Sequence, residues 1–279
     1  MRWSGVARSN CCAIWFRAEP SRVSAPLASS PNGGLGNGPA GGLRIQFSEV
    51  EKRYGMRFAL RGVNLAIAAG ECVALVGHNG SGKTTLLKIA AQLTQPSRGK
   101  VSFFAGENPI PPEEVKCRVG MVGHHTLLYE ELTAEENLIF FAKLFGLADP
   151  AQKARQALQP VGLAGRATDL VRTFSRGMRQ RLSIARALLA TPGLLFLDEA
   201  GTGLDPEGQH WLGATIQRLR DSGCTILMST HGRNETQGAV TRAIRLDGGK
   251  ITHDSGAGGN PREILVMAAV RESGEEGQS

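Results

Sequence analysis

The chain has 279 residues, of which 41% are hydrophobic and 20% are charged, as is ordinary for a soluble globular protein of one large domain or two small ones. The formal net charge is +7, of which four arginines and one acid in residues 1–42 account for +3. The remaining +4 is only weak evidence for nucleic-acid binding, but it suits an anionic ligand or a membrane surface. No apolar run approaches the roughly 18–20 residues that a membrane-spanning helix needs, so work at a membrane would require another chain.

Residues 1–42 are predicted to lie outside the folded domain. The segment 29–42, SSPNGGLGNGPAGG, cannot bury enough apolar surface to offset the entropy of ordering it. The part before it is rich in Arg and Ser and nearly free of acids, which suits either a cleaved organelle transit peptide or an over-long reading frame with translation starting near Leu43. We interpret residues 1–42 as a disordered or non-native extension.

From Leu43 the chain begins with strand-like segments. Strands are predicted at residues 43–50, 63–68, 72–76, 100–104 and 118–122. The run CVALV at 72–76 is continuously apolar, as in a strand buried on both faces, and glycines follow it at once. A helix is predicted over 84–93. Because the earliest strands have no helices between them, they are expected to form an antiparallel side layer.

The second half of the chain alternates helices with short buried strands. Thr133 and Glu136 predict a capping box that opens a helix running to Gly146. Further helices are predicted at 151–158, 178–190 and 206–223, buried strands at 194–197 and 224–229, and a hairpin over 242–252. Residues 254–279 are expected to be a flexible polar tail. This alternation predicts an α/β fold with a mostly parallel core sheet.

A phosphate-binding loop follows the strand at 72–76. The segment GHNGSGKTT fits G-x-x-x-x-G-K-[ST] and lies between a buried strand and a helix, where its backbone N–H groups can turn toward phosphate oxygens. Lys83 is expected to reach the β- and γ-phosphates, and Thr84 to offer its hydroxyl to Mg²⁺. The predicted nucleotide-binding residues here are Gly77, His78, Asn79, Gly80, Ser81, Gly82, Lys83, Thr84 and Thr85.

Two carboxylates end the strand in GLLFLDEA. Asp198 and Glu199 are therefore expected at the carboxyl edge of the sheet, where open α/β sheets bind ligands. Asp198 can hold Mg²⁺ together with Thr84, directly or through water. Glu199 can orient and polarise the attacking water as a general base.

The segment 174–188, FSRGMRQRLSIARAL, lies just upstream of that strand, and with the two motifs above it resembles the ATP-binding cassette (ABC) ATPases. The resemblance covers roughly residues 43–252. It implies a P-loop NTPase fold of the ABC type over residues 43–253, with a helical subdomain at about 126–180. It also implies ATP and Mg²⁺ as cofactors and ATP hydrolysis as the reaction.

In this family the signature motif of one subunit closes over the nucleotide held by the other. The resemblance assigns the signature contacts to Ser175, Arg176, Gly177 and Met178, with Arg176 standing where many members have glycine. It places Asp205, in GTGLDP, in the D-loop across the dimer interface. A homodimer with two active sites is expected, although a heterodimer stays open.

Three further positions acquire roles from the resemblance. His231 follows the strand at 224–229 and would contact the γ-phosphate, so Glu199 and His231 are the expected catalytic residues. Tyr54 matches the aromatic residue that stacks on adenine. Ala200 and Gly201 depart from the usual Pro-Thr after the catalytic glutamate, but both carboxylates remain.

Two adjacent histidines follow the strand at 118–122. His124 occupies the position of a family glutamine that senses Mg²⁺ and the attacking water, so we predict that it lies in the nucleotide site. His125 is expected to project the opposite way, which argues against a shared metal. The "GH" here, followed by LTAEENL, is similar to the haem-exporter ATPase subunit of cytochrome c maturation.

The resemblance implies an ATPase subunit, peripheral on the cytoplasmic face of the inner membrane, that powers a separate integral membrane permease, with haem export as the first reading. Residues 133–165 and the His124 loop are the expected permease-docking surface. Alternatives are an ATPase of another exporter, for drugs, lipids or polysaccharides, or a soluble ABC ATPase of translation or DNA repair. A single cassette with a short span before the signature argues against the soluble classes.

Overall fold

The computed structural model describes residues 42–123, 125–230 and 238–267. Nearly all of the predicted extension 1–42 lies outside this range, as do His124 and His231. The predictions for these residues are therefore sequence-based only.

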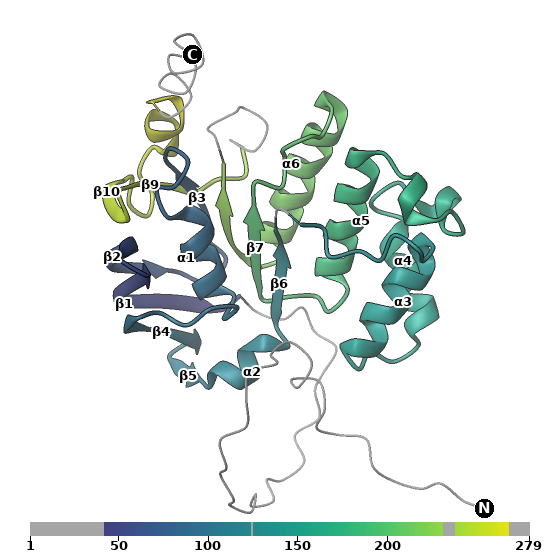
Figure 1. The fold of residues 1–279 in the computed structure, drawn as a ribbon, viewed down its shortest axis with the longest axis horizontal. Helices are drawn as coiled ribbons and strands as arrows, with labels where there is room; N and C mark the ends of the chain where they lie inside the picture. The colour runs from purple at the N-terminus through teal and green to yellow at the C-terminus, as the bar shows by residue number, and fades with distance from the viewer. Residues whose placement is uncertain (1–41, 124, 231–237, 268–279) are drawn as a thin grey trace, which may run out of the picture.

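An antiparallel sheet forms the first layer, as the sequence predicted (Figure 1). Its strands, in the order β2-β1-β4-β5, are β1 Arg44–Tyr54, β2 Arg57–Ile67, β4 Arg98–Ala105 and β5 Asn108–Ile110. Along β1 and β2 the apolar side chains alternate with exposed ones, so one face of the sheet packs on the core and the other meets solvent. β5 was not predicted because a three-residue strand containing proline carries no alternation signal.

The core sheet has six strands in the order β10-β9-β3-β8-β7-β6. They are β3 Cys72–Val76, β6 Val119–Val122, β7 Leu194–Asp198, β8 Thr225–Ser229, β9 Arg242–Asp247 and β10 Lys250–Asp254. All neighbouring pairs are parallel except β9 with β10, which forms the predicted hairpin. Every residue of β3, β7 and β8 is buried, because helices and the other sheet cover both faces. The carboxyl ends of these strands therefore meet at one edge.

The α-helices that flank the sheets are α1 Lys83–Ala90, α2 Pro112–Lys116, α3 Ala134–Leu144, α4 Pro150–Leu158, α5 Arg176–Leu188 and α6 Pro206–Asp221. Two short 3₁₀ helices, η1 Ala164–Arg166 and η2 Val171–Thr173, lie between α4 and α5. The predicted capping box opens α3, since the Thr133 hydroxyl accepts from the Glu136 backbone N–H and the Glu136 carboxylate accepts from the Thr133 N–H. Figure 1 shows α3, α4 and α5 together on the side of the core sheet away from the antiparallel sheet, where they share a separate hydrophobic cluster. Within the described ranges, none of the helices has the length and apolarity that a bilayer crossing requires.

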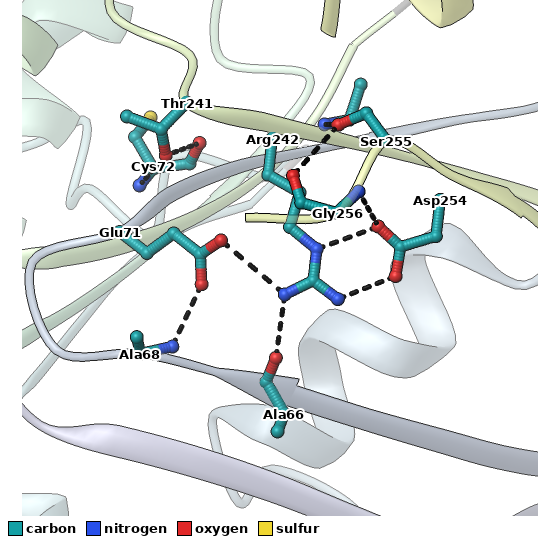
Figure 2. Close-up of polar contacts among 10 residues, drawn as sticks. Ala66, Ala68, Glu71, Cys72, Thr241, Arg242, Asp254, Ser255 and Gly256 are labelled. Atoms are coloured by element: carbon teal, nitrogen blue, oxygen red, sulfur yellow. Dashed lines mark hydrogen bonds and ion pairs between the residues drawn. The ribbon is translucent and has the colours of Figure 1, made fainter. Parts of the chain in front are cut away.

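The segment after β9 differs from the flexible tail expected from residue 254. Asp254 ends β10, residues 261–267 are helical, and Leu265 is only 1% exposed in the core. At the start of this segment, both carboxylate oxygens of Asp254 accept hydrogen bonds from Arg242, at 2.8 and 2.6 Å (Figure 2). Arg242 also donates to the Ala66 carbonyl at 2.9 Å and lies 3.5 Å from Glu71. Polar composition alone could not reveal this long-range pairing.

Candidate functional site

The phosphate loop occupies the turn between β3 and α1, as the motif predicted. Gly77 has a φ of 148°, and a Cβ there would lie 2.2 Å from the carbonyl oxygen of Leu246. Gly82 has a φ of 112°, and its Cβ would lie 2.6 Å from the carbonyl oxygen of Ala59. Both positions thus exclude any side chain, because neighbouring backbone fills the space.

Lys83 and Ser81 give this loop the chemistry of an anion site. Lys83 is only 5% exposed. Its ammonium donates to the carbonyls of Gly77, at 2.5 Å, and His78, at 3.2 Å. The Ser81 hydroxyl is buried and has no hydrogen-bond partner among the described residues. A cation held by its own loop and an unsatisfied buried hydroxyl fit a phosphate group, which would supply acceptors to both.

The two carboxylates lie beside the loop, at the end of β7. Asp198 is 5% exposed, and its Oδ1 accepts hydrogen bonds from the hydroxyls of Thr84, at 3.1 Å, and Ser229, at 2.8 Å. The Ser229 hydroxyl in turn accepts from the backbone N–H of Glu199 at 2.9 Å. The structure therefore links the phosphate loop to the Asp198 carboxylate and to the backbone of Glu199 in one hydrogen-bonded chain.

Ser229 is the member of this chain that sequence analysis missed. It is 1% exposed and ends β8, the strand next to β7 in the sheet. The available signal was its place at the end of a buried strand, two residues before His231. Its Cα pairing with Asp198 could be known only from the sheet order.

Glu199 has a strained backbone. Its φ is +54°, in the left-handed region that non-glycine residues enter at a cost of order 1–3 kcal/mol. The hydrogen bond from its N–H to Ser229 and the turn in which its carbonyl accepts from Thr202, at 2.9 Å, hold it there. Strain of this kind, held in place by surrounding contacts, gathers at functional sites, and here it falls on the predicted general base.

The chemistry of the donor set fits Mg²⁺. A hydroxyl on Thr84 and a carboxylate on Asp198 are the oxygen ligands this cation prefers, and they already lie together. Two protein ligands suffice, because Mg²⁺ in nucleotide sites keeps waters and binds phosphate oxygens.

The predicted signature residues gather at the start of α5. Ser175 caps the helix, its hydroxyl accepting from the N–H of Met178 at 3.2 Å. The exposed side chain of Arg176 lies against the backbone of Gly203, whose φ is +84° and whose Cβ would be 2.5 Å from the arginine Nε. Arg176 is therefore accommodated by a glycine in the neighbouring loop, and Gly177 faces Leu204 of the same loop.

The predicted D-loop residue lies beside the signature. Asp205 caps α6, with its carboxylate accepting from the N–H of Gly208 at 2.9 Å, and lies 3.9 Å from Arg181 of α5. Gln180 of α5 donates to the carbonyl of Ala200 at 3.0 Å. Helix α5 thus contacts several points of the loop 200–205 that follows Glu199.

Tyr54 is at the end of β1 and is 54% exposed, with the Lys52 ammonium 5.2 Å from its ring centroid. The paired strand β2 passes the phosphate loop at Ala59, which contacts Gly82. The aromatic ring is therefore accessible to a ligand. His124 and His231 lie outside the described residues, so the structure does not place them.

Comparisons with known proteins find extensive similarity. The model of the ABC transporter family matches residues 60–202. Nod factor export ATP-binding protein I of Burkholderia thailandensis is 36% identical over 225 residues, covering 79% of this chain and 72% of that protein. Daunorubicin resistance ATP-binding protein DrrA3 of Streptomyces coeruleorubidus is 34% identical over 238 residues, covering 84% and 75%. The dimeric post-hydrolysis structure of the ATP-binding cassette MJ0796 bound to ADP and Pi matches with a TM-score of 0.68 at 27% identity, covering 75% and 97%.

Proposed function

The chain belongs to the ABC transporter family, as an ATP-binding subunit whose ATP hydrolysis is coupled to transport, and we propose that it drives a separate membrane permease in export. The observation that carries the proposed active site is the hydrogen-bonded chain from Thr84 through Asp198 and Ser229 to Glu199. It joins the phosphate loop, through the Asp198 carboxylate, to the backbone of the residue proposed as general base.

The roles of the site residues follow from their chemistry. Lys83 exchanges its bonds to the loop carbonyls for the β- and γ-phosphates. Thr84 and Asp198 would hold Mg²⁺, which when bound would neutralise charge on the phosphate oxygens. Glu199 accepts a proton from the attacking water. His231 at the γ-phosphate, His124 near the water and Tyr54 at the adenine complete the proposal from sequence resemblance.

A second copy of the chain completes each site in this proposal. The start of α5 offers backbone N–H groups and the Ser175 hydroxyl, and its first turn has no acidic side chain. These features suit the γ-phosphate of an ATP molecule bound by the partner subunit. Arg176, Gly177 and Met178 would share that contact, with Asp205 nearby. The dimeric MJ0796 structure supports a two-subunit arrangement.

The proposed permease-docking surface lies on α3 and the loop before it. Leu127, Tyr129 and Phe140 are exposed apolar residues, at 50%, 50% and 40%, and the rings of Tyr129 and Phe140 meet edge to face with centroids 5.0 Å apart. An apolar patch of this kind suits a protein partner. We place the subunit peripherally on the cytoplasmic face of the inner membrane, where such a permease would present its cytoplasmic segments.

The exported substrate is proposed from the relatives. The two reported above are named for Nod factor export and for daunorubicin resistance. They favour an exporter of drugs, lipids or polysaccharides over haem export. Haem export was the first interpretation of the sequence, and it rests on the "GH" at 123–124 and LTAEENL. The "GH" motif is thus a weaker guide to the substrate than the similarity over more than two thirds of the chain.

Glu199→Gln tests the proposed function. The amide keeps the shape of the side chain but is a poor general base, so ATP binding should persist while turnover falls at least 100-fold. An ATP-bound dimer should then accumulate and elute earlier in gel filtration. Lys83→Ala serves as the control that loses binding itself. Wild-type turnover in Glu199→Gln would refute the role given to this carboxylate.

A further inference from the structure

The turn between β9 and β10 packs directly on the phosphate loop. The carbonyl oxygen of Leu246 occupies the space where Gly77 would carry a Cβ. The backbone N–H of Gly249 donates to the carbonyl of Ser81 at 3.1 Å, and its own carbonyl accepts from Arg61 of β2 at 2.8 Å. The hairpin turn therefore supports the loop from the side of the sheet edge.

His78 adds a side-chain contact to this support. Its Nδ1 lies 2.7 Å from the carbonyl oxygen of Asn79, and its Nε2 lies 3.1 Å from Oδ1 of Asp247 at the end of β9. The imidazole thus bridges the backbone of the phosphate loop and the carboxylate of Asp247.

The hairpin is held firmly at its other end. Arg242, at the start of β9, binds Asp254, at the end of β10, through two hydrogen bonds, and reaches Glu71 just before β3 (Figure 2). Asp247, at the far end of β9, reaches His78 just after β3. The hairpin is thus tied to both ends of the strand that leads into the phosphate loop.

We propose that Asp247 is a positioning residue for ATP: through its contact with His78 it holds the phosphate loop in its nucleotide-binding form. This inference rests on the proposed ATP site and adds a residue outside its motifs. Asp247 and His78 are half-exposed, at 49% and 52%, so the pair has a moderate effect and is replaceable without unfolding the protein.

The test is a double-mutant cycle on steady-state ATP hydrolysis with Asp247→Ala, His78→Ala and the double variant. A loop held less firmly binds ground state and transition state alike more weakly, so KM should rise about 3- to 10-fold while kcat stays within about twofold. The double variant should be no worse than His78→Ala alone, because the two residues act through one contact. Asp247→Glu, which keeps the carboxylate, should restore most of the affinity.

Glu107→Ala is the matched control, because it removes one carboxylate from a turn of the other sheet where the side chain is 97% exposed. Each variant is checked by its melting temperature. Unchanged KM in Asp247→Ala, or effects that simply add in the double variant, would overturn the inference while leaving the ATP site intact. Loss of the proposed function would show differently, as wild-type protein without ATPase activity or as full activity in Lys83→Ala.

Discussion

At the scale of single residues, Ser229 connects the Asp198 carboxylate to the backbone of Glu199. Its hydroxyl donates to Asp198 and accepts from the N–H of Glu199, so one small side chain orients the residue proposed for Mg²⁺ and the residue proposed for water. The left-handed φ of Glu199 makes this second bond important, because a strained conformation persists only where contacts hold it.

Ser229→Ala should therefore lower kcat by about 10- to 100-fold, with a smaller change in KM. The variant leaves the Glu199 N–H without its acceptor and removes one of two hydroxyls from Asp198, each at a cost of about 1–3 kcal/mol in a buried site. Steady-state ATPase assays measure the split. Ser183→Ala, which removes another buried serine that bonds to Thr126, is the control. Equal losses of kcat in both variants would show a general loss of stability instead.

At the scale of elements, Arg186 joins the helical cluster to the core sheet. It is 3% exposed on α5, donates to the carbonyl of Met121 in β6 at 2.8 Å, and lies 5.2 Å from the ring of Phe141 in α3. Burial lowers the pKa of Arg186 to about 10. Its Nε has no hydrogen-bond partner within the described residues, so the guanidinium is held mainly by packing.

Arg186→Ala should lower the free energy of unfolding by about 2–4 kcal/mol, because it opens a cavity between three elements and removes the hydrogen bond to the Met121 carbonyl. Arg186→Met should recover about half of that loss, since it fills the volume without burying a charge. Urea unfolding followed by circular dichroism measures both. Wild-type stability in Arg186→Ala would mean that the cluster packs on the sheet without this link.

At the scale of the whole molecule, long-range ion pairing joins the two sheets near the C-terminal segment. Arg242 of the core sheet donates to the carbonyl of Ala66, at the end of β2 in the antiparallel sheet (Figure 2). It also pairs with Glu71, just before β3, and with Asp254 at the end of β10. The hydrogen bonds from Arg242 hold the pKa of Asp254 below its usual range. The folded state therefore favours the ionised carboxylate.

Asp254→Asn should reduce stability at pH 7 and make it less sensitive to acid. A carboxylate with a lowered folded pKa stabilises the fold above its unfolded value of about 3.9, and this contribution is lost as pH falls through the folded value. The stability gap between wild type and variant should thus narrow below about pH 4. Urea unfolding at pH 7 and pH 3 measures the gap. A gap that stays constant with pH would show that the charge of Asp254 is not what matters.

The sequence by itself determined the features that local patterns encode. The phosphate loop follows from fixed spacing of Gly77, Gly82 and Lys83, and the capping box from Thr133 and Glu136, three residues apart. The apolar runs at 72–76 and 194–197 predicted the parallel core, because strands buried on both faces need no polar alternation.

Only the tertiary structure decided the contacts between residues far apart in the chain. Ser229 lies beside Asp198, and Asp247 beside His78, because β8 and β9 flank strands that precede them in sequence. Asp254, where the flexible tail was predicted to begin, is held at the end of β10 for the same reason, since the hairpin brings it to Arg242. Sheet order brings such groups together, and a linear pattern does not record it.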